Sequence, residues 1–170
     1  VGFNGTLKDF FGHLRTDPQF KFASKQALLD GYNAIRARVD AAVPTLFTLT
    51  PGSPFEIRPV PGYSEQNEAA GSYRQGTPDG TRPGIFFVNT YDLPSRTTPG
   101  METLFLHEAI PGHHFQIALA QENEALPNFM RFGGNTAFVE GWALYAESLG
   151  PELGMFTDPY QAFGSLDDEM

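Results

Sequence analysis

The chain has no cysteine, few basic residues and no long apolar run. Without cysteine it has neither a disulfide framework, nor a thiolate metal site, nor a cysteine nucleophile. Lys and Arg number 11 against 20 Asp and Glu, a net charge of −9, which argues against nucleic acid as a partner and against a polybasic membrane-surface role. No segment approaches the ~18 apolar residues that a membrane span needs, so no membrane-spanning segment is predicted.

The residues that are abundant indicate a globular fold with long loops. Hydrophobic residues make up 41% of the 170 residues, and 18 Gly and 14 Pro disfavour a simple helix bundle. We therefore predict an α+β fold, mainly helical with a small β-sheet, in a single domain over residues 1–170. Because the chain begins at Val1, with neither an initiator Met nor a signal peptide, we expect a processed chain or a piece of a longer one.

Hydrophobic periodicity divides the chain into three segments. Residues 1–43 read as a helical scaffold, with helices over 5–15 and from the cap Ser24 to about Val43. Residues 44–98, rich in Pro and Gly, form a strand and loop region with expected strands at 55–58, 69–74 and 85–90. Residues 99–150 carry two helices that bear the candidate metal ligands. One is expected from Pro99 in its first turn, capped by Thr98, to about Glu124, and the other from Asn135 or Thr136 to Leu149.

Three of the four histidines lie close together, at His107, His113 and His114, and Glu108 follows the first of them. Two imidazoles on neighbouring helical turns can bind one divalent ion, and a carboxylate beside the first can reach a water molecule on that ion. The alternative is that these are packing or surface histidines. Their clustering beside a glutamate favours the metal site.

The histidine spacing differs from the familiar H-E-x-x-H motif, in which the second histidine follows the first by four residues. His113 and His114 follow His107 by six and seven residues. Pro111 cannot donate to the carbonyl of His107, so we expect a bulge near Pro111-Gly112 that absorbs extra residues within the helix. With two residues absorbed, His113 takes the place of the second ligand. We therefore favour His113 over His114, which would then support a ligand or face the substrate.

A catalytic zinc site needs a third protein ligand and an open position for water. Glu140 is the candidate, because a carboxylate among apolar neighbours costs free energy unless it meets a cation. The alternative for Glu140 is an acidic residue near a helix N-terminus, favoured by the helix dipole. Glu147 follows seven residues later on the same helical face, where it either orients a histidine ring or stays in water.

Two long motifs resemble one bacterial family. The motifs are His107 to Gln116 (HEAIPGHHFQ) and Phe138 to Glu147 (FVEGWALYAE), and they are similar to the family catalogued as domain of unknown function 885. The segment from Gly80 to Thr90 (GTRPGIFFVNT) fits the same pattern, so the resemblance covers most of the chain. Members of that family are larger, mostly helical, and often carry lipoprotein or secretory signals. The resemblance therefore implies an extracytoplasmic location.

The family in turn resembles the gluzincin metallopeptidases, in which a glutamate on a second helix is the third zinc ligand. By this resemblance the chain is a gluzincin-like catalytic core fragment that binds Zn²⁺. The ligands would be His107, His113 (or His114) and Glu140, and Glu108 would be the catalytic base. The implied function is a zinc-dependent peptidase with a peptide substrate.

The strand expected at 85–90 gives a candidate substrate contact. In gluzincins the edge strand beside the zinc pairs with the substrate backbone, which makes Asn89 a candidate amide contact by β-augmentation. The alternative is that 85–90 is an ordinary core strand. Arg74, Arg82 and Arg96 flank this region, each either as a surface arginine or as the partner of a substrate carboxylate.

Two other functions remain open from the residues alone. The same water activation would serve an esterase or amidase acting on a non-peptide substrate. A catalytically inactive binding domain or fragment would hold metal without turning over substrate, and a purely structural domain would pack its histidines without metal.

Overall fold

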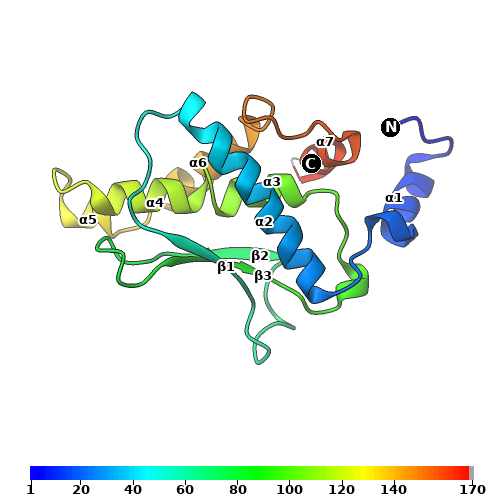
Figure 1. The fold of residues 1–170 in the computed structure, drawn as a ribbon, viewed down its shortest axis with the longest axis horizontal. Coiled ribbons are helices and arrows are strands. Elements are labelled where there is room, and N and C mark those ends of the chain that lie inside the picture. The colour runs from blue at the N-terminus through cyan, green and yellow to red at the C-terminus, as the bar shows by residue number, and fades with distance from the viewer. Residues whose placement is uncertain (169–170) are drawn as a thin grey trace.

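A computed structural model describes residues 1–168 and confirms the predicted α+β class: helices packed with one small sheet (Figure 1). The α-helices are α1 (Leu7–Thr16), α2 (Lys25–Ala42), α3 (Met101–Glu108), α4 (His113–Glu122), α5 (Asn128–Arg131), α6 (Thr136–Ser148) and α7 (Pro159–Asp168). Short 3-10 helices lie at η1 (Pro18–Phe20), η2 (Val43–Thr45) and η3 (Leu93–Ser95). The strands are β1 (Phe55–Pro59), β2 (Gly71–Arg74) and β3 (Gly84–Val88).

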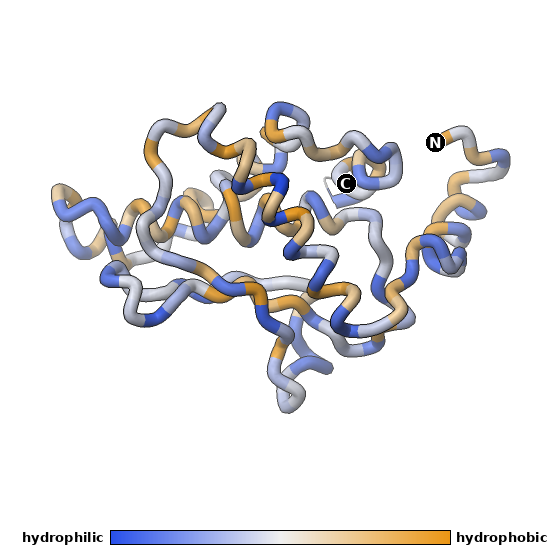
Figure 2. Tube along the Cα trace, viewed as in Figure 1, coloured by the Kyte–Doolittle hydropathy of each residue, from blue (hydrophilic) through white to orange (hydrophobic). Residues whose placement is uncertain are grey.

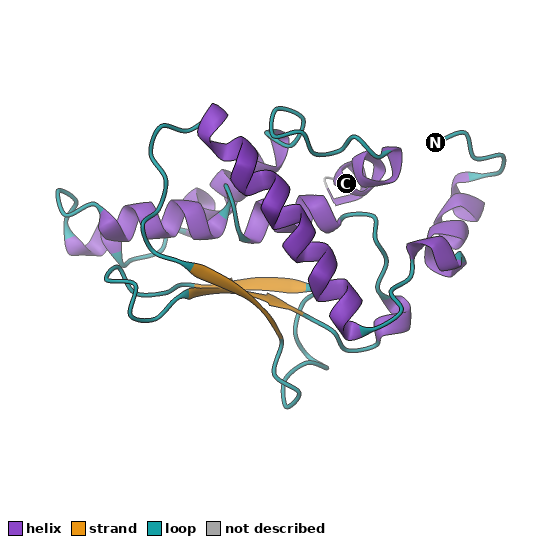
Figure 3. Ribbon diagram, in the orientation of Figure 1, coloured by secondary structure: helices purple, strands orange, loops and turns teal. Residues whose placement is uncertain are grey.

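The sheet has the order β1-β3-β2, so β3 lies in its centre. β1 pairs with β3 in parallel and β2 pairs with β3 antiparallel. Most helices lie on one side of the sheet, with α3 and α4 following one another nearly in line above it, while α1 lies apart (Figure 1 and Figure 3). Since β3 is central, the expectation that residues 85–90 form an edge strand is wrong. The edge strand that packs against α3 and α4 is β2.

The core lies between the sheet and the helices above it. Along α2, apolar residues alternate with polar ones (Figure 2), and its buried face consists of Leu28, Tyr32, Ile35 and Val39, as its periodicity predicted. This face packs with Phe86 of β3 and with Phe105 and Leu106 of α3, all fully buried. Packing on both sides therefore holds α3, which carries His107 and Glu108, in a fixed position.

Local signals located two helix starts correctly and missed a third. Ser24 caps α2 and Asn135 caps α6, each through a side-chain oxygen that accepts a backbone N–H of the first turn. The prediction of Thr98 as the cap of α3 is wrong, because α3 begins at Met101 after Gly100, whose φ of 85° few other residues adopt. None of the helices in residues 1–168 combines the length and apolarity needed to cross a lipid bilayer.

Candidate metal centre

The histidine motif spans two helices rather than one. α3 ends at Glu108, α4 begins at His113, and residues 109–112 between them are not helical. The prediction of one helix continuing to about Glu124 with a bulge is therefore wrong. The physical reason is that Pro111 has no N–H to donate and Gly112 leaves the helical conformation, with ψ of −130°.

Close backbone packing holds this connector in place. A Cβ atom on Gly112 would overlap the carbonyl oxygens of His107 and Leu106, so only glycine fits at that position. The indole N–H of Trp142 on α6 donates to the carbonyl oxygen of Pro111 over 2.7 Å. The connector is therefore bound both to the end of α3 and to α6, the helix that carries Glu140.

Three candidate ligands converge on one point. The Nε2 atom of His107 lies 3.3 Å from a carboxylate oxygen of Glu140, and the Nε2 atom of His113 lies 3.7 Å from the same oxygen. The three potential ligand atoms all lie within 4.8 Å of one another. The two imidazole rings stand nearly perpendicular, at 83°, with centroids 4.6 Å apart. This arrangement leaves room between the three side chains for one ion, and Glu140, half exposed, keeps the point open to solvent.

Glu147 lies behind His107. Its carboxylate oxygen is 2.6 Å from His107 Nδ1, and its side chain is buried. An Nδ1–H that donates to Glu147 leaves Nε2 of the same ring as the acceptor that faces Glu140. Burial lowers the pKa of His107, but Glu147, Glu108 and Glu140 outweigh burial and raise the pKa overall.

Glu108 is buried beside the three converging side chains. Burial raises the pKa of its carboxyl, His107 lowers it, and the charge of Glu140 raises it again. The backbone of Tyr73 on β2 lies near the Glu108 carboxyl and acts to lower its pKa. A buried carboxylate with a raised pKa beside a polar cluster is suited to accept and return a proton.

The donor set matches the chemistry of a zinc ion. Two imidazoles and one carboxylate are a common catalytic zinc set, and a fourth position stays free for water. Burial lowers the pKa of His113, an effect that His107 reinforces, and a neutral imidazole is the form that binds metal. The Nδ1 atom of His113 is buried without a hydrogen-bond partner among the described residues. The residues present therefore fit a divalent metal ion, with His107, His113 and Glu140 as its candidate ligands.

His114 lies outside this group. Its Nδ1 atom is 3.0 Å from the hydroxyl of Tyr73, and its ring packs 4.6 Å from that of Phe55, centroid to centroid. Burial lowers the pKa of His114 to about 4, and the nearby Arg36 acts in the same direction. Successive residues of a helix point in different directions. Because His113 points toward His107 and Glu140, His114 points toward the sheet.

Asn89 makes different contacts from those expected of a substrate-binding residue. Its amide nitrogen donates to the carbonyl oxygens of Glu65 and Glu68, and its Oδ1 accepts the N–H of Tyr91. The side chain is fully buried. Asn89 therefore connects the loop before β2, at Glu65 and Glu68, with the loop after β3, at Tyr91. A side chain engaged in these contacts is not placed to bind a substrate backbone.

Sequence reasoning missed two residues that shape this site. The backbone of Tyr73 lies near Glu108, and its hydroxyl is 3.0 Å from His114 Nδ1. Trp142 ties α6 to the histidine connector. Trp142 lies in the second motif, Phe138 to Glu147, so its place in that motif could have indicated a role near the site. Tyr73 lies in an ordinary strand pattern, and only the packing of β2 against α3 reveals its contacts.

Two cavities lie near the two ends of β2. One of about 270 Å³ is bounded by Gln75 just after β2, by Gln116 and Ile117 one turn after His113, and by Val139 next to Glu140. The other, of about 260 Å³, lies at the start of α3 and is bounded by Ala70, Leu104 and Arg96, among others. β2 runs from the second cavity toward the first, and Glu108 lies beside its middle.

Comparison with known proteins places the chain in a family. No curated protein matches it. It is similar to a solved structure titled "The crystal structure of the putative lipoprotein from Colwellia psychrerythraea", with 34% identity and a TM-score of 0.91. The match covers 98% of this chain and 29% of the Colwellia chain. Residues 1–170 also match the family described as "Bacterial protein of unknown function (DUF885)". The chain therefore belongs to the DUF885 family of bacterial proteins.

Proposed function

We propose that this protein is a zinc-dependent peptidase of the gluzincin type. The observation that carries the proposal is the convergence of His107, His113 and Glu140 within 4.8 Å, with Glu108 buried beside them. The proposal concerns the site within this chain, which spans 29% of the length of the Colwellia relative. The name of that relative is the reason to propose an extracytoplasmic location as well.

The ligands and the base have separate roles. When bound, a zinc ion lowers the pKa of a water molecule and polarises a carbonyl group. Glu108 accepts a proton from the attacking water at its carboxylate and delivers it to the amide nitrogen as the C–N bond breaks. The products are a carboxylic acid and an amine, so water is consumed and no other reactant is needed. Glu147 orients His107 throughout by accepting its Nδ1–H.

The free edge of β2 is the proposed place for the substrate backbone. The N–H of Asn89 donates to the carbonyl of Ala70, so the backbone groups of Ala70 point toward β3. Because backbone groups alternate in direction along a strand, those of Ser72 and Arg74 point toward β3 as well. The groups of Gly71 and Tyr73 then point away from β3. A peptide that pairs with this edge passes Glu108. This role replaces the one expected of the strand at 85–90.

The test is the exchange of Glu108 for glutamine in the protein loaded with zinc. Glu108→Gln keeps the size of the side chain and removes its proton acceptor. Peptide hydrolysis should fall by about 100-fold or more while zinc content stays equimolar. Glu124→Gln, on an exposed loop, is the matched control and should keep full activity. Unchanged hydrolysis in Glu108→Gln contradicts the proposal.

A panel of esters and non-peptide amides separates the peptidase from the alternative hydrolase. The same residues would hydrolyse either kind of substrate, so the relative rates of hydrolysis distinguish the two functions. Faster turnover of esters that lack a peptide backbone would favour an esterase over the peptidase, because such substrates cannot form backbone hydrogen bonds with the edge of β2.

A further inference from the structure

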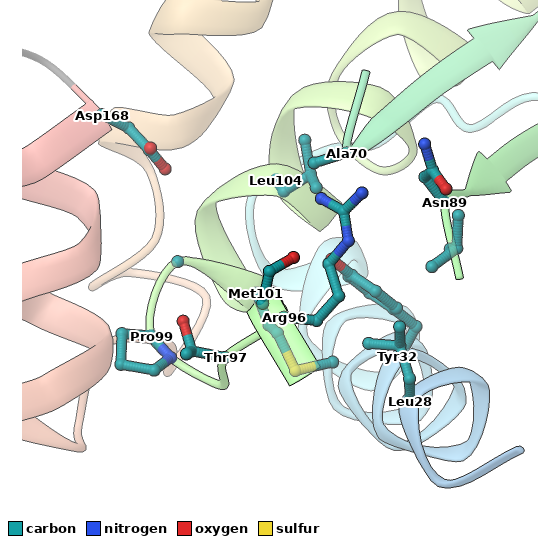
Figure 4. A pocket seen from close by; sticks show the side chains of 13 residues that line it. Leu28, Tyr32, Ala70, Asn89, Arg96, Thr97, Pro99, Met101, Leu104 and Asp168 are labelled. Atoms are coloured by element: carbon teal, nitrogen blue, oxygen red, sulfur yellow. The ribbon is translucent and has the colours of Figure 1, made fainter. Parts of the chain in front are cut away.

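The cavity at the start of α3 carries a guanidinium that has no carboxylate partner within residues 1–168. Arg96 is partly buried in its wall, and its Nε donates to the carbonyl oxygen of Tyr91 over 3.3 Å. Within residues 1–168 no carboxylate lies within 4 Å of Arg96. Figure 4 shows the guanidinium in the middle of the lining side chains, with Asp168 apart from it on α7. A planar guanidinium with unused donors in a half-enclosed hollow is suited to bind a carboxylate.

The position of Arg96 is set by a chain of hydrogen bonds. Asn89, fully buried, accepts the N–H of Tyr91, and the carbonyl of Tyr91 accepts the Nε–H of Arg96. Asn89 is in turn bound to two carbonyl groups of the loop before β2, those of Glu65 and Glu68. The guanidinium therefore sits on an ordered loop, which reduces the entropy lost when a ligand binds.

The floor of the cavity is apolar. Leu28 and Tyr32 of α2 and Met101 of α3 line it below Arg96. A volume of about 260 Å³ lies below the range of a drug-sized site and is suited to the end of a larger ligand. The cavity thus combines a cationic anchor with an apolar floor, while the Asp168 carboxylate lies in the wall away from Arg96 (Figure 4). An anchor beside an apolar floor is what a terminal amino-acid residue with an apolar side chain requires.

The cavity adjoins the site of the proposed reaction. Leu104 in its wall lies one helical turn before Glu108, and Ala70 in its wall directly precedes β2. Burial raises the pKa of the Tyr32 phenol, Arg96 lowers it, and Asp168 and Glu108 raise it, so these three charges act on one group. A ligand held at Arg96 therefore extends along β2 toward Glu108.

The direction of the strand gives the polarity of the ligand. β2 runs from Gly71 to Arg74, so a peptide pairing with it in the antiparallel sense runs from Arg74 toward Gly71. Its carboxyl end then arrives at Ala70 and the cavity. Resting on the proposed function, we propose that Arg96 binds the C-terminal carboxylate of the peptide substrate, and that the site releases short C-terminal fragments. From Tyr73 to Ala70 the strand advances by roughly 10 Å, which corresponds to a fragment of about two or three residues.

The test compares two peptides that differ only at the C-terminus. A short dye-labelled peptide ending in Ala-Phe is prepared as the free acid and as the amide, and binding to the metal-free protein is measured by fluorescence anisotropy. The free acid should bind about 10-fold more tightly, since a hydrogen bond to a charged group contributes at least that much. Arg96→Met should remove this preference, and Arg96→Lys should retain part of it, because the charge remains without the planar fork.

Arg74→Met is the matched control. Arg74 stacks on the ring of Phe87, lies at the other end of β2, and should leave the preference for the free acid unchanged. Melting curves of every variant verify that the fold is retained. Equal binding of acid and amide by the unmodified protein, or an undiminished preference in a folded Arg96→Met, overturns the assignment.

The outcomes separate this inference from the peptidase proposal. Peptide hydrolysis that is indifferent to C-terminal amidation leaves the peptidase standing and removes the role of Arg96. A preference for the free acid that depends on Arg96, in a protein that hydrolyses no peptide, supports the binding site and removes the peptidase.

Discussion

The Nδ1 atom of His107 lies 2.6 Å from a carboxylate oxygen of Glu147, which itself is buried. The two residues are on different helices, α3 and α6. Their contact therefore does two things at once: it selects the nitrogen of His107 that faces the cluster, and it fixes the distance between the helices that carry the candidate ligands.

Removing the Glu147 carboxylate should weaken metal binding without removing a ligand. Glu147→Gln should lower zinc affinity by about 10-fold to 100-fold, since residues that orient a ligand typically contribute this much. Competition with a chromophoric chelator measures the affinity. Glu152→Gln, on the exposed turn that follows α6, is the control. Equal affinities of the two variants would mean that the contact with His107 does not support the metal.

The two neighbouring histidines should behave differently. His113→Ala should weaken zinc binding more than Glu147→Gln does, because it removes a proposed ligand. His114→Gln should keep zinc binding and change stability, because His114 packs against Phe55 and contacts Tyr73. Metal content and thermal melting of both variants measure these effects. Loss of zinc from a folded His114→Gln together with its retention by His113→Ala would reverse the assignment.

Gly112 should not tolerate a side chain. Gly112→Ala places a Cβ atom against the carbonyl oxygens of His107 and Leu106, and the resulting shift should lower the free energy of unfolding by about 1–3 kcal/mol. Gly141→Ala on α6 is a matched control. A Cβ atom there meets no atom within 4 Å, and the exchange should stabilise the helix by about 1 kcal/mol. Urea unfolding distinguishes the two, and equal stabilities would show that the connector is not tightly packed.

Asp168 should make stability depend on pH. Although Asp168 is an exposed residue, its carboxyl loses part of its contact with water, and this raises its pKa from 3.8 to about 6. The charges of Glu147 and Asp167 add to the increase in pKa, and His107 opposes it. Because the folded state holds this proton more tightly than the unfolded state, its contribution to stability is complete below pH 3.8. The contribution is lost as the pH rises through about 6. Asp168→Asn should remove this loss, so the variant gains on the unmodified protein between pH 4 and pH 6.

Urea unfolding across that pH range measures the difference between the two proteins. Glu124→Gln controls for the loss of one negative charge from a chain with an excess of acidic residues. Parallel stability curves for Asp168→Asn and the unmodified protein would show that the folded state does not raise the pKa of this carboxyl.

The sequence predicted the scaffold well because its signals are local. The spacing of Leu28, Tyr32, Ile35 and Val39 follows the helical period, and that face is buried. Ser24 and Asn135 satisfy the first free N–H groups of their helices. The helices α5 and α7 were not predicted. α5 has only four residues and buries none of them, and α7 buries only Gly164, so neither has the buried apolar face from which a helix is predicted.

The order of the strands in the sheet could not be predicted from local sequence signals. The segment at 85–90 has an apolar pattern that both a central and an edge strand can show. Its place between β1 and β2 follows from pairing across long loops, and this pairing turned Asn89 toward the loop at Glu65 and Glu68. The sequence could not show this, because a side chain alone does not reveal the partner of its strand.

The amino-acid sequence by itself determined the chemistry available here. Histidine and carboxylate are the only strong metal-binding side chains in a chain without cysteine, and they occur within two motifs. Only the tertiary structure decided which of them meet. The interruption of the helix at Pro111 turns His113 to the cluster and His114 to Tyr73, while α6 brings Glu140 and Glu147 to His107. The physical reason is that ligand geometry depends on how helices pack, and packing depends on residues far apart in the chain.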